Sequence, residues 1–180
     1  MRKISKKDIK ILRDLAYEVK EISEQPEQKT NAERWLRLNR LERVPPPVLV
    51  LAHNIWNEMP PDTYLQTEDE FAQSYERDLR RRIYKYHHFR DDGVVTATVP
   101  VPLVMEYTDW GISAHTTAPE QKTGAKHYHT VLHDERDLDR IRMPQVIIDY
   151  EKTEENFVQA QEIPVSYTHL RAHETPEHLV

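Results

Sequence analysis

The sequence contains no cysteine and only three glycines among its 180 residues. Without cysteine the chain has no disulfide framework, no thiolate nucleophile and no sulfur ligand for zinc, which excludes a small disulfide scaffold and a zinc ribbon. We therefore expect a reducing, cytoplasmic environment. The sequence also lacks a glycine-rich phosphate loop, a G-x-S-x-G elbow and an H-E-x-x-H pair, so chemistry through those motifs is not indicated.

Long hydrophobic runs and an excess of basic charge are missing as well. The longest apolar run is 48–52, far short of the roughly 20 residues that cross a bilayer. Lys and Arg number 25 against 31 Asp and Glu, which gives a formal net charge of −6. A general nucleic-acid binder needs a positive surface to displace counterions. We expect a soluble protein with neither a membrane nor a nucleic-acid partner.

Two amphipathic helices are predicted before the first strand. Apolar residues recur at spacings of three and four over 9–22, and Ser5 is a candidate N-cap for this helix. A second helix is expected to open with Thr30 and Glu33 in capping-box spacing. The prolines at 45–47 end it, because proline has no N–H to donate within a helix.

A strand–helix–strand unit is predicted next, which makes the fold class α/β. The continuous apolar run 48–52 is typical of a strand that is covered on both faces in a parallel sheet. Apolar residues at helical spacing over 68–89, with Thr67 opening a capping box, predict the crossover helix. Asp-Asp-Gly at 91–93 is a turn signal, and 94–99 is typical of a second strand. The crossover of such a unit is right-handed.

Shorter patterns predict the structure of the following residues. Pro100 and Pro102 are expected to stop the second strand, which leaves 103–110 as an irregular loop. The later elements expected are a hairpin arm at 126–132, a short charged helix at 134–142, an apolar segment at 146–148 and a last helix at 151–163.

Candidate pocket residues follow the two predicted strands, because ligands in α/β folds bind at the carboxyl ends of strands. These candidates are His53, Asn54, Trp56 and Glu58 after the first strand, and Asp109 and Trp110 after the second. His53 or Glu58 would act as an acid, a base or a hydrogen-bond partner. The alternatives are that the first loop only packs against its neighbours and that Asp109 caps a turn at Gly111, where a positive φ is expected. No catalytic residue is assigned.

Histidines form a further group of candidates. Three of them would share one face of a strand and its continuation: His127, His129 and His133. Imidazoles two residues apart on a strand bind metals, usually with a further ligand. The same alternation is common on exposed hairpins, which is the favoured interpretation. We therefore expect no metal or other cofactor to be bound by these residues.

The predicted helix 68–89 carries a basic face opposite its apolar one. Its members are Arg77, Arg80, Arg81 and Lys85. A solvated surface is favoured for this face, and a phosphate or carboxylate site is the alternative.

Five short motifs stand in a recognisable order. They are RVPPPVLV at 43–50, LRRRIY at 79–84, DDGV at 91–94, DWG at 109–111 and DERDLDRIRMP at 134–144. Together they resemble the amino-terminal part of proteins in the uroporphyrinogen decarboxylase superfamily. The resemblance covers about 9–149 and is closer to the branch grouped with corrinoid-dependent methyltransferases.

This resemblance implies the amino-terminal part of a (β/α)₈ TIM barrel. Residues 1–44 would be a helical extension, and 45–164 would hold the first βα units with a hairpin insertion. Such a barrel needs about 250 residues, so the chain is expected to be an incomplete and inactive fragment. In the methyltransferase members a zinc ion, held by His and Cys of the carboxyl-terminal half, activates a thiol acceptor or substrate. The resemblance thus implies zinc, a corrinoid protein and a small-molecule substrate for the full-length parent.

The sequence departs from the decarboxylase itself. The decarboxylase has an arginine-rich motif after the first strand, where this sequence has HNIW at 53–56. The decarboxylase also has an aspartate after the second strand, where this sequence has TVP at 98–100. These departures favour methyl transfer over tetrapyrrole decarboxylation, with a decarboxylase-type lyase as an alternative. A further alternative is a non-catalytic α+β binding module that uses the helical pair and the face around Trp35.

Residues 165–180 do not take part in the resemblance. The string VSYTHLRAHET at 165–175 looks like one translated frame of a transposase adapter used to build sequencing libraries. We expect 165–180 to be a non-native, adapter-derived tail rather than a natural disordered one, and leave it outside the fold and the function.

Overall fold

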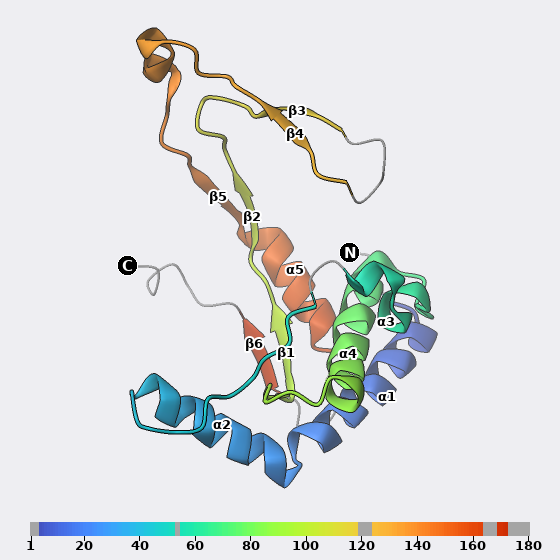
Figure 1. Ribbon diagram of the computed structural model, residues 1–180. Helices are drawn as coiled ribbons and strands as arrows, with labels where there is room; N and C mark the ends of the chain where they lie inside the picture. Colours follow the sequence, from blue (N-terminus) through green and yellow to red (C-terminus); the bar gives the residue numbers. More distant parts are fainter. Residues whose placement is uncertain (1–3, 53–54, 119–123, 164–168, 173–180) are drawn as a thin grey trace. The chain divides into compact units, whose positions relative to one another are not determined.

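Helices dominate the part of the chain that the computed structural model describes, residues 4–52, 55–118, 124–163 and 169–172. The chain divides into two compact units. Met1–Pro102 and Glu154–Val180 form the helical unit, and Leu103–Thr153 forms the hairpin unit. Helices and strands are mixed along the chain (Figure 1), which agrees with the predicted α/β class at that coarse level.

Two long helices form the frame of the helical unit. They are α1 (Lys6–Ser23) and α4 (Glu70–His88), and they lie against each other (Figure 1). Both confirm predicted amphipathic helices. Ser5 caps α1 as predicted, because its hydroxyl oxygen accepts the Asp8 N–H at 3.0 Å. This bond satisfies a donor that the first turn of a helix otherwise leaves unpaired.

The cap of α4 differs from the prediction. Asp69, not Thr67, accepts the N–H groups of Phe71 and Ala72, at 3.0 and 3.3 Å. Thr67 instead donates its hydroxyl to the buried carboxylate of Glu76 at 2.8 Å. The capping-box spacing is misleading here because aspartate caps a helix as well as threonine does, and this aspartate stands directly before the first helical residue.

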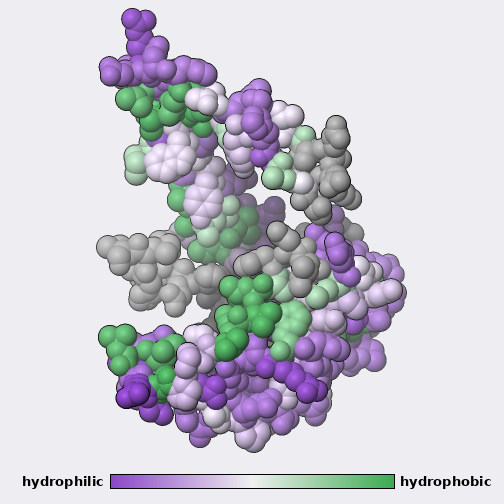
Figure 2. All heavy atoms as spheres, in the orientation of Figure 1, coloured by the Kyte–Doolittle hydropathy of each residue, from purple (hydrophilic) through white to green (hydrophobic). Residues whose placement is uncertain are grey.

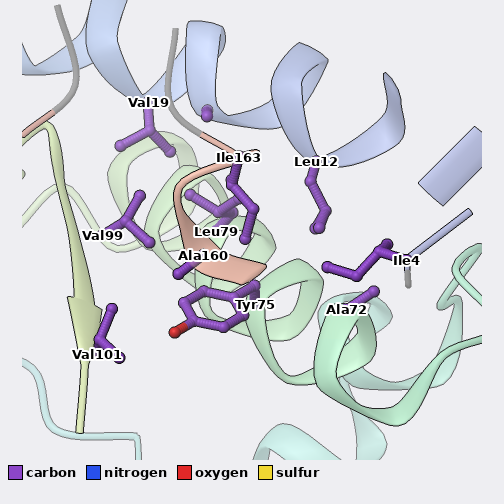
Figure 3. Close-up of a cluster of buried hydrophobic side chains, with 11 residues drawn as sticks. Ile4, Leu12, Val19, Ala72, Tyr75, Leu79, Val99, Val101, Ala160 and Ile163 are labelled. Atoms are coloured by element: carbon purple, nitrogen blue, oxygen red, sulfur yellow. The ribbon is translucent and has the colours of Figure 1, made fainter. Parts of the chain in front are cut away.

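The core of the helical unit lies between α1, α4, β1 (Thr98–Val101) and the end of α5 (Tyr150–Ala160) (Figure 3). Its largest fully buried apolar side chains are Leu12, Val19, Val99, Val101 and Ile163. Burying each of these contributes about 1.5–3 kcal/mol. Tyr75 lies among them, and its hydroxyl donates to the Pro100 carbonyl oxygen at 3.0 Å. Burial, aided by the Asp78 carboxylate, raises the pKa of Tyr75 to about 12.

The second predicted helix is α2 (Pro26–Asn39), and it begins before the predicted opening at Thr30. Proline suits the first helical position because its φ is preset and its missing N–H has no partner there. Thr30 lies inside the helix, where its hydroxyl donates to the Pro26 carbonyl oxygen at 3.2 Å. α2 ends at Asn39, before the prolines at 45–47 are reached, and Leu41 follows it with a positive φ of 60°.

The buried strand predicted at 48–52 does not form. Residues 45–52 have no regular structure, and the side chains of Val48, Leu49, Val50 and Leu51 are 63, 43, 41 and 66 % exposed. Figure 2 shows hydrophobic side chains open on the face along which this segment runs in Figure 1. A buried parallel strand needs a neighbour on each side, and no described strand pairs with this segment.

The second predicted strand is shifted along the chain. β1 replaces 94–99 and pairs in parallel with β6 (His169–Ala172), with Val99 opposite Leu170. Pro100 therefore lies within the strand and does not stop it, which a strand with a single neighbour tolerates. The pairing places β6 in the fold, although the tail 165–180 is predicted to lie outside it. Since 48–52 is not a strand, the predicted βαβ crossover is also wrong.

One antiparallel pair of the hairpin unit corrects a prediction. β2 (Val104–Tyr107) pairs with β5 (Val146–Asp149), so 103–110 is not simply a loop. Pro100 and Pro102 are predicted to stop the strand before them, but a new strand, β2, begins shortly after Pro102. The apolar segment predicted at 146–148 is the partner strand.

The other antiparallel pair confirms the predicted hairpin arm. β4 (His127–His129) pairs with β3 (His115–Thr117), which the sequence analysis does not predict. The charged helix predicted at 134–142 is present as a 3₁₀ helix, η2 (Glu135–Arg140).

The remaining helices are α5, which confirms the last predicted helix, and the short η1 (Ile55–Glu58) and α3 (Pro60–Thr63). The strands of the described residues form two-stranded sheets and close no barrel. Across the same residues, no helix combines the length and the hydrophobicity that a bilayer crossing requires.

Candidate functional site

A charged cavity of about 710 Å³ lies in the helical unit. Its walls are α2, the carboxyl-terminal half of α4 and the turn that leads from α4 toward β1. The titratable and basic side chains that line it include Glu27, Arg82, Lys85, His87, Arg90, Asp91 and Asp92. The sequence prediction places candidate pocket residues elsewhere, after the ends of strands.

Asp92 joins three segments at the edge of this cavity. Its carboxylate accepts a hydrogen bond from Arg34 of α2 at 2.7 Å and another from the Val48 N–H at 2.8 Å. Its own N–H donates to the Val48 carbonyl oxygen at 2.8 Å, and its carbonyl oxygen accepts the Trp35 indole N–H at 2.7 Å. One residue of the turn therefore holds α2 and the segment 48–52 in place.

Asp91 holds the segment 48–52 at Val50, two residues after the point where Asp92 binds it. Its carboxylate accepts the Val50 N–H at 2.8 Å and the Gly93 N–H at 3.1 Å, and it pairs with the Lys85 ammonium at 3.1 Å. Burial alone would raise the pKa of Asp91. The donors from Val50, Lys85 and Gly93 outweigh burial and hold the pKa of this carboxyl below its usual value. Asp91 is therefore ionised at neutral pH.

Two members of the predicted basic face of α4, Arg80 and Lys85, pair within the chain, and so does the neighbouring Arg82. Arg80 pairs with Glu76 at 2.7 Å. Arg82 donates to the Thr98 carbonyl oxygen at 2.7 Å and pairs with Asp78 at 2.6 Å. With Lys85 bound to Asp91, each of these three cationic side chains has an acceptor within the chain. The arrangement organises the turn before β1.

Two buried carboxylates are important features that the sequence analysis misses. The fully buried Glu76 accepts hydrogen bonds from the Gln66 N–H, from the N–H and hydroxyl of Thr67, and from Arg80. Burial alone would raise its pKa, but these donors outweigh burial and lower it. Asp8 is 1 % exposed, and its Oδ1 has no partner among the described residues. Both lie at helical positions in the sequence, where a carboxylate normally faces water.

The predicted first-loop residues divide between packing and exposure. His53 and Asn54 lie outside the described residues. Trp56 stacks on Phe89 with ring centroids 5.8 Å apart, and Arg81 lies over its ring at 5.2 Å. Trp56 therefore fastens η1 to the end of α4, as in the packing alternative. Glu58 is exposed at the end of η1.

The predicted second-loop residues belong to the hairpin unit. Asp109 accepts the Ser113 hydroxyl at 2.7 Å and the Gly111 N–H at 2.8 Å, and these two bonds lower the pKa of Asp109. Gly111 has the expected positive φ of 76°. A Cβ there would also collide with the Arg140 carbonyl oxygen. Asp109 thus caps a turn, which is the alternative stated for it, and Trp110 is 57 % exposed. Because Trp56 and Glu58 lie in the helical unit, the two predicted groups belong to different units.

The histidine group gains one member and loses another. His127 and His129 share a face of β4, and His115 lies opposite His129 on β3. His133 follows the strand, outside the paired region. His115 is not among the predicted histidines because the sequence pattern indicates only one arm of the hairpin. As the side chains stand, no three metal-ligating groups of the described residues are arranged around an ion.

Known protein families, curated proteins and solved structures yield no match to this chain.

Proposed function

We propose that the chain is the amino-terminal part of a cytoplasmic, uroporphyrinogen-decarboxylase-like barrel enzyme. Its full form transfers a methyl group between a corrinoid protein and a small molecule. The motifs at 43–50, 79–84, 91–94, 109–111 and 134–144 suggest the family. The structural observation that supports the proposal is the apolar run 48–51, which is exposed and yet anchored to the turn before β1.

The anchoring involves one side of this run. Val48 exchanges two hydrogen bonds with Asp92, and the Val50 N–H donates to Asp91. In an extended chain, alternate residues direct their backbone groups to the same side. The backbone groups of Leu49 and Leu51 are thereby directed to the opposite side. Such one-sided anchoring would suit a strand whose second neighbour came from further units of the full-length protein.

The exposure of the run supports the same proposal. Its four side chains are apolar, and each would contribute about 1.5–3 kcal/mol if buried. Folded chains seldom leave a continuous apolar patch open unless something covers it. Further strand–helix units of the same protein would cover this one and pair with it on its open side.

In the full barrel, the first loop would contribute His53, Asn54, Trp56 and Glu58 to the mouth. The zinc ligands would come from His and Cys residues beyond 164, and the corrinoid protein would be a separate partner. Glu58, which is exposed at the end of η1, is the carboxylate that this loop would offer for hydrogen bonding to the substrate.

The test is the contiguous genomic sequence beyond codon 164, followed by an assay of its product. We expect an open frame with further strand–helix units and a His/Cys cluster. With Zn²⁺ present, the full product should transfer the methyl group of methylcobalamin to a thiol, whereas the 180-residue chain should not. A stop codon directly after 164 would contradict the proposal, and so would full-length protein that carries no such cluster.

The alternative of a self-sufficient binding module has less support. Its expected docking face is centred on Trp35, whose indole N–H already donates to the Asp92 carbonyl oxygen. This side chain helps to hold α2 against the turn at 91–93. A sharp two-state melt of the chain, with no binding of a hydrophobic dye, would favour the module over the barrel fragment.

A further inference from the structure

The hairpin of β3 and β4 gathers imidazoles on one face. In its register His115 is opposite His129, and Thr117 is opposite His127. Facing residues of an antiparallel pair project to the same side of the sheet, and so do residues two apart on one strand. The three histidines and Thr117 therefore share a face.

The three rings are already close to one another. The centroids of His115 and His129 are 5.2 Å apart, and those of His127 and His129 are 4.8 Å apart. Two nitrogens on one zinc ion, each about 2.0–2.1 Å from it, lie about 3.4 Å apart. All three side chains are exposed, so their rings turn between rotamers without disturbing a core. Because no three ligands of the described residues surround a common point as the side chains stand, metal binding requires these rings to rotate from their present positions.

A hydrogen bond on the same face suits the central ring to this role. Nε2 of His129 lies 2.7 Å from the Thr117 hydroxyl oxygen. When His129 donates its Nε2–H to Thr117, its Nδ1 carries the free lone pair. Histidines that bind metals typically donate their other ring N–H to an oxygen acceptor, which fixes the tautomer and the ring orientation.

We propose that His115, His127 and His129 bind one divalent transition-metal ion, with Thr117 orienting His129 and water completing the coordination. Three neutral imidazoles and no carboxylate select zinc, copper or nickel over magnesium or calcium. The set differs from the one the sequence suggests, because His115 from the partner strand replaces His133. The proposal does not depend on the proposed barrel function, since it rests only on contacts within the pair β3–β4.

The test is a calorimetric titration of the metal-free 180-residue chain with Zn²⁺. The absorption of bound Co²⁺ is a second probe. We expect one high-affinity ion per chain. Changing an orienting partner typically weakens metal binding about 10–100-fold, and we expect that loss for Thr117→Val. Loss of a ligand should cost more than this, so His115→Gln, His127→Gln and His129→Gln should each weaken binding by at least about 100-fold.

Two matched controls separate this site from binding to other histidines. His133→Gln removes the residue that the sequence alone suggests, and His88→Gln removes an exposed imidazole at the end of α4. Neither change should alter the affinity. The proposal is wrong if the chain binds no Zn²⁺, if the triple variant of His115, His127 and His129 binds as tightly as the unchanged chain, or if His133→Gln weakens binding as much as His115→Gln does.

Discussion

Two apolar segments of the helical unit differ in burial: one is buried in the core and the other is exposed. The stripe of α1 is buried against α4, with Leu12 at 0 % and Val19 at 2 % exposure. The run 48–51 is at least as apolar in sequence, but Leu51 remains 66 % exposed. A helix satisfies its own backbone and needs only one apolar neighbour, whereas a buried strand needs neighbours on both edges and both faces. Burial therefore depends on the partners that the chain supplies as well as on hydrophobicity.

The largest effect expected from this contrast comes from paired leucine truncations. Leu12→Ala should lower the free energy of unfolding by about 3–5 kcal/mol, because it opens a cavity in a closed core. Leu51→Ala removes the same atoms from an exposed position and should change it by less than about 0.5 kcal/mol. Urea unfolding of the two variants measures both values. Equal losses would mean that 48–51 is packed in solution.

Glu76 tests whether the α4 side of the core depends on its buried carboxylate. Glu76→Gln leaves donors of Gln66 and Thr67 facing an amide, so at neutral pH we expect a loss of about 2–3 kcal/mol. Since folding lowers the pKa of Glu76, its stabilisation is present above the ordinary pKa of a glutamate and is lost as the pH falls through the lowered one.

The pH dependence of unfolding measures this contribution. Between pH 7 and 3 the unchanged chain should lose more stability than Glu76→Gln, so the two curves should converge in acid. Glu58→Gln, at an exposed position of η1, is the control and should follow the unchanged chain. Parallel curves for the unchanged chain and Glu76→Gln would contradict the lowered pKa.

Asp92 tests the anchoring of the exposed run. Asp92→Ala removes the carboxylate that holds Arg34 and the Val48 N–H, and should cost about 1–2 kcal/mol. Its clearest consequence should be local: protease cleavage within 45–52 should become faster while α1 stays protected. Asp139→Ala in η2 is the matched control at an exposed aspartate, and it should leave cleavage at 45–52 unchanged.

Tyr75 offers the smallest effect, at the junction of α4 and β1. Tyr75→Phe keeps the ring in the core and removes only the hydrogen bond to Pro100, so we expect a loss of about 0.5–1.5 kcal/mol. In an ultraviolet alkaline titration, the variant should lack the tyrosine that ionises near pH 12. Tyr64→Phe, at a 72 % exposed position, should leave stability unchanged.

The features that the sequence predicts well are those determined locally. The apolar period of α1 and α4 is strong enough to identify both helices. Ser5 stands at an N-cap, where its hydroxyl accepts a backbone N–H, and Gly111 stands in a turn with a positive φ. The predicted cap at Thr67 is wrong because Asp69, directly before α4, caps the helix instead. The predicted opening at Thr30 is wrong because Pro26, which suits the first helical position, begins α2.

The features that the sequence misses depend on distant partners. β1 includes Pro100, although proline is expected to end a strand. The strand that pairs with β1 among the described residues is β6, about 70 residues later in the chain, so no local pattern indicates the pairing. His115 joins His129 across a hairpin whose first arm has no strong pattern of its own. Glu76 is buried because Thr67 and Gln66 fold back over α4, a contact that helical periodicity does not encode.

Amide hydrogen exchange along 45–52 tests most directly the claim that this run is a strand still lacking its second neighbour. In the chain alone, Leu49 and Leu51 should exchange far faster than Leu12 to Val19 of α1, with Val48 and Val50 slowed by their bonds to the two aspartates. When the product of the contiguous gene beyond codon 164 is supplied, the exchange of Leu49 and Leu51 should slow to that of the core. Exchange as slow as that of α1 in the chain alone, or no change on adding that product, would contradict the account.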